Sequence, residues 1–269
     1  MARREIPEIN AGSMADIAFL LLLFFLVTTT MEKDQAYIRD IPEESKVPPE
    51  NQEIQTRNVF HIYANNKDQL LLVDRNGPGN SVPVKNIENL SEDIYKWYLS
   101  NRKPINKKMA DMFPNPGNNE SFPQYYGMSA KDCEIEIEKF EKSLTQIKDP
   151  VKSKTVAKDI REYEVKSRLF KKFYGDDEKV QLINVKAHIR IEIQPKTSYE
   201  LFTQIQSEVE EAICKVRNEI ALNQFGETYE KIRTKASIEN DKKYDEDRKK
   251  QKLLQILVPQ RVIEILTKK

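Results

Sequence analysis

The sequence predicts an α+β protein with a single N-terminal transmembrane helix, an extended linker and a small exported mixed α/β domain that carries a helical insertion. Three observations predict this class. An apolar run near the N-terminus has spanning length, a polar stretch with three prolines follows it, and strand-type and helix-type hydrophobic periods share the remainder. The expected divisions are a cytoplasmic tail at 1–12, a transmembrane helix at 13–31, a linker at 32–56, a domain at 57–226 with its insertion at 103–180, and a charged extension at 227–269.

The run from Ser13 to Met31 is expected to cross a membrane. As a helix it would be roughly 28 Å long, close to a hydrocarbon thickness of about 30 Å. Its large apolar side chains favour insertion by about 3–6 kcal/mol in total, whereas its one acid costs about 2.5–3.5 kcal/mol. No small-x-small cleavage site follows, so we interpret the run as a retained anchor rather than a signal peptide. Arg3 and Arg4 precede it, which places the N-terminus in the cytoplasm and the later residues outside.

Asp16 is the only charged residue in this run and the main candidate for a functional residue. An ionisable group in a spanning helix is costly and rare, and usually serves a function. The alternative is an acid that reaches the cytoplasmic interface from one turn inside the membrane. Ser13 shares the helix face of Asp16 and is placed to hydrogen-bond it. Thr28, Thr29 and Thr30 either line a polar path to the outside or bond backbone carbonyls one turn back.

Composition argues against several other classes. The chain has 269 residues, 44 basic against 43 acidic, and no dominant basic block, so no nucleic-acid partner is expected. Neither metal-binding Cys/His spacing nor a G-x-S-x-G or H-E-x-x-H motif is present. We therefore expect no enzyme, no metal and no cofactor. Cys133 and Cys214 either form one disulfide in an oxidising compartment or remain two free thiols.

The exported part begins with strand and helix patterns. Residues 58–64 and 69–74 have strand propensity and flank a four-residue turn, which predicts a hairpin. Apolar residues at helical spacing predict an amphipathic helix over 86–101, whereas clustered Pro, Asn and Gly make residues 103–130 look irregular. Apolar and polar residues alternate strictly from Ile183 to Gln194, which predicts one strand of twelve residues.

Helices are expected over most of the remainder. The strand at 183–194 should lead into a helix with Thr197 as N-cap, Glu200 completing a capping box and Gly226 as its stop. Two surface helices, at 131–148 and 152–174, should be separated at Asp149-Pro150. Residues 227–252 are dense in charge, which predicts a solvated helix or a flexible arm. The apolar tail at 253–266 is expected to form an edge strand or a short helix.

Two stretches resemble a known family. PEINAGSMADIAFLLLLFFLVTTTMEKDQAYIRDIP and IRIEIQPKTSYELFTQIQSEVEEAICKVRNEIAL are similar to the N-terminal motif and the strand–helix region of ExbD/TolR biopolymer transport proteins. Short stretches of the hairpin and of residues 258–261 resemble members from Bacteroidetes, whereas the insertion at 103–180 is a departure. The resemblance implies a non-enzymatic subunit of a bacterial inner-membrane motor with a periplasmic domain. Two copies would lie inside a pentamer of an ExbB- or TolQ-like polytopic protein, and Asp16 would carry the coupling protons.

The resemblance and the residues leave alternatives open. An ExbD-type subunit would serve a TonB-like protein and outer-membrane transport, whereas a TolR-like subunit would serve TolA and envelope integrity. A passive membrane-tethered module that binds peptidoglycan or a protein is the alternative from another class. In such a module, neutralising Asp16 should have no effect.

Overall fold

The structure is a computed structural model that describes residues 17–24, 56–73, 81–83, 87–114, 117, 120–147, 149–238 and 241–266. The chain divides into two compact units, Met1–Asn51 and Gln52–Lys269. In the first unit, residues 17–24 form a helix. The second unit contains the hydrophobic core. Its single-turn 3-10 helices are η1 (Thr56–Asn58), η2 (Ile87–Asn89) and η3 (Lys242–Tyr244).

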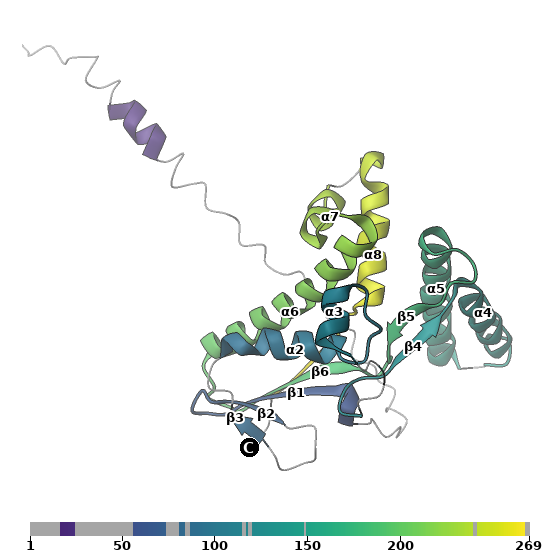
Figure 1. The fold of residues 1–269 in the computed structure, drawn as a ribbon, viewed down its shortest axis with the longest axis horizontal. Helices are drawn as coiled ribbons and strands as arrows, with labels where there is room; N and C mark the ends of the chain where they lie inside the picture. The colour runs from purple at the N-terminus through teal and green to yellow at the C-terminus, as the bar shows by residue number, and fades with distance from the viewer. Residues whose placement is uncertain are drawn as a thin grey trace, which may run out of the picture. The chain divides into compact units, whose positions relative to one another are not determined.

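A mixed five-stranded sheet forms the centre of the described part of the second unit (Figure 1). Its spatial order is β3 (Ser81–Pro83), β2 (Leu70–Val73), β1 (Val59–Ala64), β6 (His188–Ile193) and β7 (Val262–Leu266). The pairs β1–β2 and β2–β3 are antiparallel, whereas β1–β6 and β6–β7 are parallel. The predicted hairpin at 58–74 is confirmed, and the C-terminal tail supplies an edge strand.

Two helices, α2 (Leu90–Leu99) and α6 (Tyr199–Phe225), cover one face of this sheet (Figure 1). The face they cover carries every second residue of β1 and β6, which is why the strands alternate in burial. Trp97 is fully buried there and meets the Phe60 ring edge to face at 5.8 Å. The stop predicted at Gly226 is confirmed, because that glycine ends α6 in the left-handed conformation with φ 68°.

The prediction of one strand over 183–194 is wrong. Residues Val180–Ile183 form β5, which pairs with β4 (Tyr125–Met128) in a separate two-stranded sheet. A turn at Asn184 separates β5 from β6: its Oδ1 accepts from the Lys186 amide at 2.9 Å, and its carbonyl accepts from the Ala187 amide at 2.9 Å. Four residues, an even number, lie between β5 and β6. The alternation of apolar and polar residues therefore stays in phase across the turn, and the sequence pattern does not reveal the break.

The described part of the insertion is largely helical. It contains α3 (Lys107–Met112), β4, α4 (Ala130–Leu144) and α5 (Pro150–Phe173), so residues 103–130 are less irregular than predicted. The predicted pair of helices is confirmed, with the break at the predicted place. The Asp149 side chain accepts from the Val151 amide at 2.9 Å, and Pro150 occupies the first helical position, where no backbone donor is needed.

The charged extension folds as two helices, α7 (Tyr229–Ala236) and α8 (Asp245–Leu257), which pack on each other. The predicted forms for 227–252 are a solvated helix or a flexible arm. The residues are helical, but Tyr229, Ile232 and Asp247 are buried, so the helices are packed rather than solvated all round. Buried Arg217 on α6 connects both helices to the core. Its guanidinium donates to the Val258 carbonyl at 3.2 and 2.9 Å and to the Tyr229 hydroxyl at 3.0 Å. These bonds satisfy a charge that would otherwise be buried at high cost.

Replacing Ile191 by Ala should destabilise the second unit by about 2–5 kcal/mol, because Ile191 is fully buried on the interior strand β6 and its loss leaves a cavity. Urea unfolding followed by circular dichroism measures this effect. The matched control is Val185→Ala, since Val185 is 57% exposed and should change stability by less than about 0.5 kcal/mol. Equal effects of the two substitutions would contradict the described core.

Candidate functional site

The five residues predicted for proton transfer, Ser13, Asp16, Thr28, Thr29 and Thr30, lie outside the described residues. Their roles therefore stay predictions. The described helix at 17–24 begins at the residue that follows Asp16 in the sequence. Among the described residues, no helix has both the length and the apolar composition that crossing a bilayer requires.

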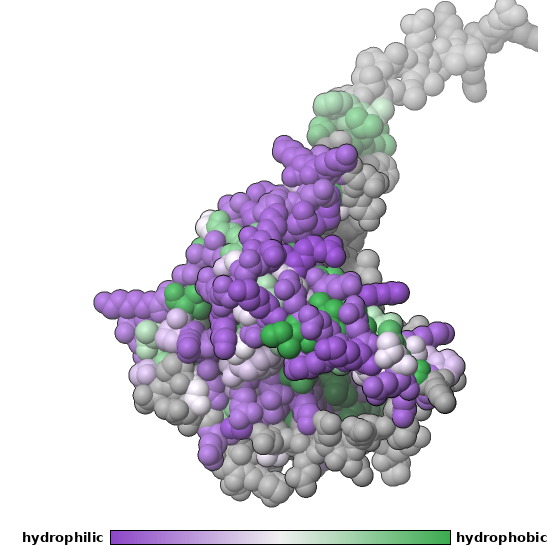
Figure 2. Space-filling view, turned by 90° about the vertical axis from the view of Figure 1, so that its right-hand side faces the viewer, coloured by the Kyte–Doolittle hydropathy of each residue, from purple (hydrophilic) through white to green (hydrophobic). Residues whose placement is uncertain are grey.

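The helix at 17–24 has no polar side chain on any face. Its seven large apolar side chains are 41% to 65% exposed. Burying them would contribute roughly 10–20 kcal/mol at about 1.5–3 kcal/mol each. A helix that is apolar all round belongs in a protein core or in a membrane. The face of the second unit shown in Figure 2 is, by contrast, mostly hydrophilic.

In the second unit, two loops at one end of the sheet are bonded to each other. The Asp68 carboxylate in the β1–β2 turn accepts from the Ser198 amide at 2.7 Å, and the Thr197 hydroxyl donates to the Asn65 carbonyl at 3.0 Å. Asp68 (φ 55°) and Lys196 (φ 82°) are the only non-glycine residues of the described part with positive φ. Such backbone strain persists where the surrounding structure holds it in place. This junction holds the start of α6 in position.

The predicted cap of α6 is wrong. Ser198, rather than Thr197, is the N-cap, and its side chain accepts from the Leu201 amide at 3.2 Å. The Thr197 hydroxyl instead donates to the carbonyls of Asn65 and Gln194. Tyr199, the next residue, is 78% exposed. Adjacent Thr and Ser are equivalent caps in a sequence, and only the tertiary contact with the β1–β2 turn separates them.

The described part shows no arrangement suited to catalysis. His61 lies 3.3 Å from the Glu192 carboxylate, and Nδ1 of His188 lies 2.8 Å from the Lys186 carbonyl, so each ring has a structural neighbour. No group of acidic, His and Cys side chains within the described ranges could hold a metal ion. Cys133 and Cys214 are both free thiols, which leaves the second of the two predicted alternatives.

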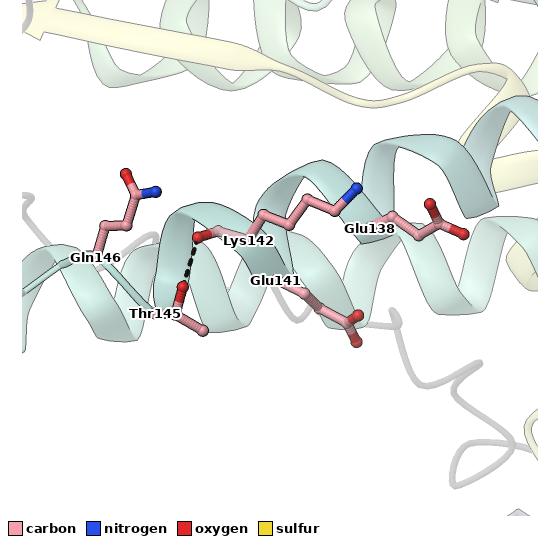
Figure 3. Close-up of a pocket in the computed structure, with 5 residues that line it drawn as sticks. All are labelled: Glu138, Glu141, Lys142, Thr145 and Gln146. Carbon is pink, nitrogen blue, oxygen red and sulfur yellow. Dashed lines mark hydrogen bonds between the residues drawn. The ribbon is translucent and has the colours of Figure 1, made fainter.

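The surface depression on α4 does not change this conclusion. It is lined by Glu138, Glu141, Lys142, Thr145 and Gln146, all from the C-terminal half of one helix and the turn after it (Figure 3). The Thr145 hydroxyl donates to the Lys142 carbonyl at 2.7 Å, as expected for a helix end. Ligand sites usually collect polar groups from several elements within an apolar cleft, and this depression has neither feature.

The sequence profile of the family "Biopolymer transport protein ExbD/TolR" matches residues 2–223. The chain belongs to the ExbD/TolR family. Neither the curated proteins nor the solved structures include a match to it. The matched residues include the apolar run with Asp16, the sheet strands β1 to β6 and most of α6. The helices α7 and α8 and the edge strand β7 follow the match.

Family membership confirms the resemblance and assigns the general class. ExbD/TolR proteins are membrane-anchored subunits of energy-transducing biopolymer transport complexes and are not enzymes. The insertion at 103–180 falls within the matched range although it contains the helix pair α4 and α5, and its strand β4 pairs with β5 in a sheet separate from the main one.

The Cys133 thiol should resist alkylation in the native protein. Cys133 is fully buried, and burial raises its pKa to about 11, so little reactive thiolate is present at pH 8. Burial also raises the pKa of Cys214. Mass spectrometry after iodoacetamide treatment at pH 8 should find Cys133 unmodified in the folded chain and fully modified in denaturant. Rapid native modification, or a mass two daltons low from a disulfide, would contradict the structure.

Proposed function

We propose that this chain is the proton-carrying subunit of an inner-membrane motor of the ExbB–ExbD type, which couples the proton motive force to TonB-dependent outer-membrane transport. The observation that carries the proposal is Asp16, a single acid in an apolar run of spanning length, in a chain of the ExbD/TolR family. The helix at 17–24 supports it, because its exposed apolar side chains require lipid or a partner protein around them.

The proposed mechanism depends on the two protonation states of Asp16. Protonated Asp16 is tolerated next to apolar surfaces, whereas ionised Asp16 requires water or a polar partner. Ser13 on the same face would hydrogen-bond it, and Thr28, Thr29 and Thr30 would line the outer end of the path. One charge crossing 100 mV supplies about 2.3 kcal/mol, which changes the ratio of two helix positions roughly fifty-fold. This work is sufficient to rotate or slide a helix between two states.

The proposed assembly follows from the family. The chain would be a single-pass protein of a bacterial inner membrane, with a cytoplasmic N-terminus and a periplasmic domain. Its partners would be a pentameric ExbB- or TolQ-like polytopic protein, a second copy of itself, a TonB-like protein and the surrounding lipid. Protons are the coupling ion, and no cofactor is needed. The linker at 32–56 would let the domain reach up to roughly 80 Å from the membrane.

A TolR-like role in the Tol envelope-integrity motor is the second candidate, because the matching family covers both branches. The two branches share the role of Asp16 and differ in the protein that receives the work. A passive tethered module is the third candidate. It requires the same anchor and no titrating group.

In a strain that otherwise lacks the protein, Asp16→Asn should reduce TonB-dependent nutrient uptake at least ten-fold, because an amide cannot carry a proton. Asp16→Glu should retain part of the uptake, since it preserves the carboxyl group and shifts its position. Uptake is compared at equal membrane abundance with wild type. Asp34→Asn, in the linker, is the matched control and should leave uptake unchanged.

Full uptake with Asp16→Asn would exclude the proton-carrying role and favour the passive module. If the strain without the protein takes up nutrient normally, the TonB assignment fails. The same variants are then tested for envelope integrity. A defect in the Asp16→Asn strain that the wild-type strain lacks identifies the Tol branch.

A further inference from the structure

Helix α5 has a strongly asymmetric charge distribution. It contains eight basic and three acidic residues. Five basic residues, Lys154, Lys158, Arg161, Arg168 and Lys172, fall within an arc of about 80° when the helix is turned at 3.6 residues per turn. All five are exposed. We call these five residues the basic face of α5. It extends over about 27 Å of the helix.

The acidic residues of α5 do not interrupt this face. Glu162 and Glu164 lie about 80° to either side of its centre, and Asp159 lies further round. Pro150 and Val165 are the only other residues of α5 within the arc, and Val165 is partly buried against the hydrophobic core. The opposite side of the helix is occupied, because Tyr163 packs on Phe140 of α4 with ring centroids 5.6 Å apart. The five residues of the basic face are exposed on the hairpin formed by α4 and α5, and the C-terminal end of the face lies next to α8, where Lys172 pairs with Glu246. Figure 1 shows the hairpin.

Most of the basic face has no acidic partner. Lys172 pairs with Glu246 on α8, whereas the other four residues make no ion pair with any described residue. Two pairs on the face, Lys154 with Lys158 and Arg168 with Lys172, place like charges four residues apart, which destabilises a helix in water. Ordinary solvated helices instead mix both signs on one face, as Glu136 and Lys139 of α4 do at 2.6 Å. An external anionic surface would relieve the repulsion on α5.

We propose that the basic face of α5 docks on the anionic lipid headgroups of the membrane in which the chain is anchored. This inference rests on the anchoring in the proposed function. Each Lys or Arg close to an anionic bilayer strengthens association about five-fold, so the four unpaired residues together supply several-hundred-fold. The face lies along one helix and carries few apolar side chains, which fits a planar array of charges rather than a specific peptide.

Lipid docking would bring the insertion, which carries α5, against the membrane. The linker at 32–56 is long enough for the second unit to approach the bilayer, since 25 residues span up to roughly 80 Å. With α5 against the headgroups, the unit would rest close to the membrane. Contact between α5 and the headgroups would hold the second unit at the membrane surface. Salt should weaken the contact, because exposed charges are screened within about 10 Å at 0.1 M.

The test uses the full-length chain inserted in nanodiscs of neutral phosphatidylcholine. Vesicles of phosphatidylcholine alone, or with one-third phosphatidylglycerol, are added and floated on a density gradient. The protein should float at least ten-fold more with the anionic vesicles, and 0.5 M NaCl should abolish the difference. The triple variant Lys154→Glu, Lys158→Glu, Arg161→Glu should lose the preference. A triple change of the same residues to Gln serves if the Glu variant fails to fold.

The matched control reverses three exposed lysines on α7 and α8: Lys231→Glu, Lys249→Glu and Lys252→Glu. It changes the net charge equally and should keep wild-type flotation. Equal losses in both triple variants would mean that net charge alone acts, and would overturn the proposal. Equal flotation of the wild type with neutral and anionic vesicles would also overturn the proposal. Binding to peptidoglycan sacculi in preference to vesicles would do the same. A chain that fails to insert into nanodiscs would overturn the anchoring, and this inference with it.

Discussion

The parallel pairing of β1 with β6 is the contact on which the rest of the second unit depends. It joins Val59 to His188 and continues to Ala64 and Ile193, across more than a hundred residues of chain. One face of the pair is buried under α2 and α6, which provides most of the core. The elements α3, β4, α4, α5 and β5 lie between β1 and β6 in the sequence, and side chains such as Met109, Cys133 and Phe170 join the same hydrophobic core. A long loop closure costs little more entropy than a short one, so an insertion of this size is tolerated.

A second set of contacts attaches the C-terminal part to that centre. Beyond the end of the family match, α7 and α8 lie between α6 and the edge strand β7. Arg217 bonds the Val258 carbonyl, and the Tyr98 hydroxyl donates to the Pro259 carbonyl at 3.1 Å. The Arg261 guanidinium donates to the Asn184 carbonyl at 2.8 Å, at the turn that separates β5 from β6. The same short segment therefore positions β7 and connects it to the base of the insertion.

The sequence predicted the elements whose periodicity is local and missed those that depend on tertiary contacts. The hairpin, α2, the helix pair of the insertion and α6 were predictable, because apolar spacing and caps such as Asp149 with Pro150 lie within each element. The strand over 183–194 was wrong because the turn at Asn184 keeps the alternation in phase. The cap of α6 was wrong because Asp68, 130 residues away, decides it. The net charge of +1 gives no sign of the basic face of α5. Its five residues are spread over the sequence and share one side only in the helical conformation. Asp16 was singled out from chemistry alone.

The central claim is that Asp16 carries protons, and proton flux measures it most directly. The chain would be reconstituted with its ExbB-like partner in liposomes that contain a pH-sensitive dye, and a potassium diffusion potential would drive protons inward. The account predicts flux with wild type, residual flux with Asp16→Glu and none above the protein-free background with Asp16→Asn. Flux that is equal in wild type and Asp16→Asn would contradict the account, whatever the effect on nutrient uptake.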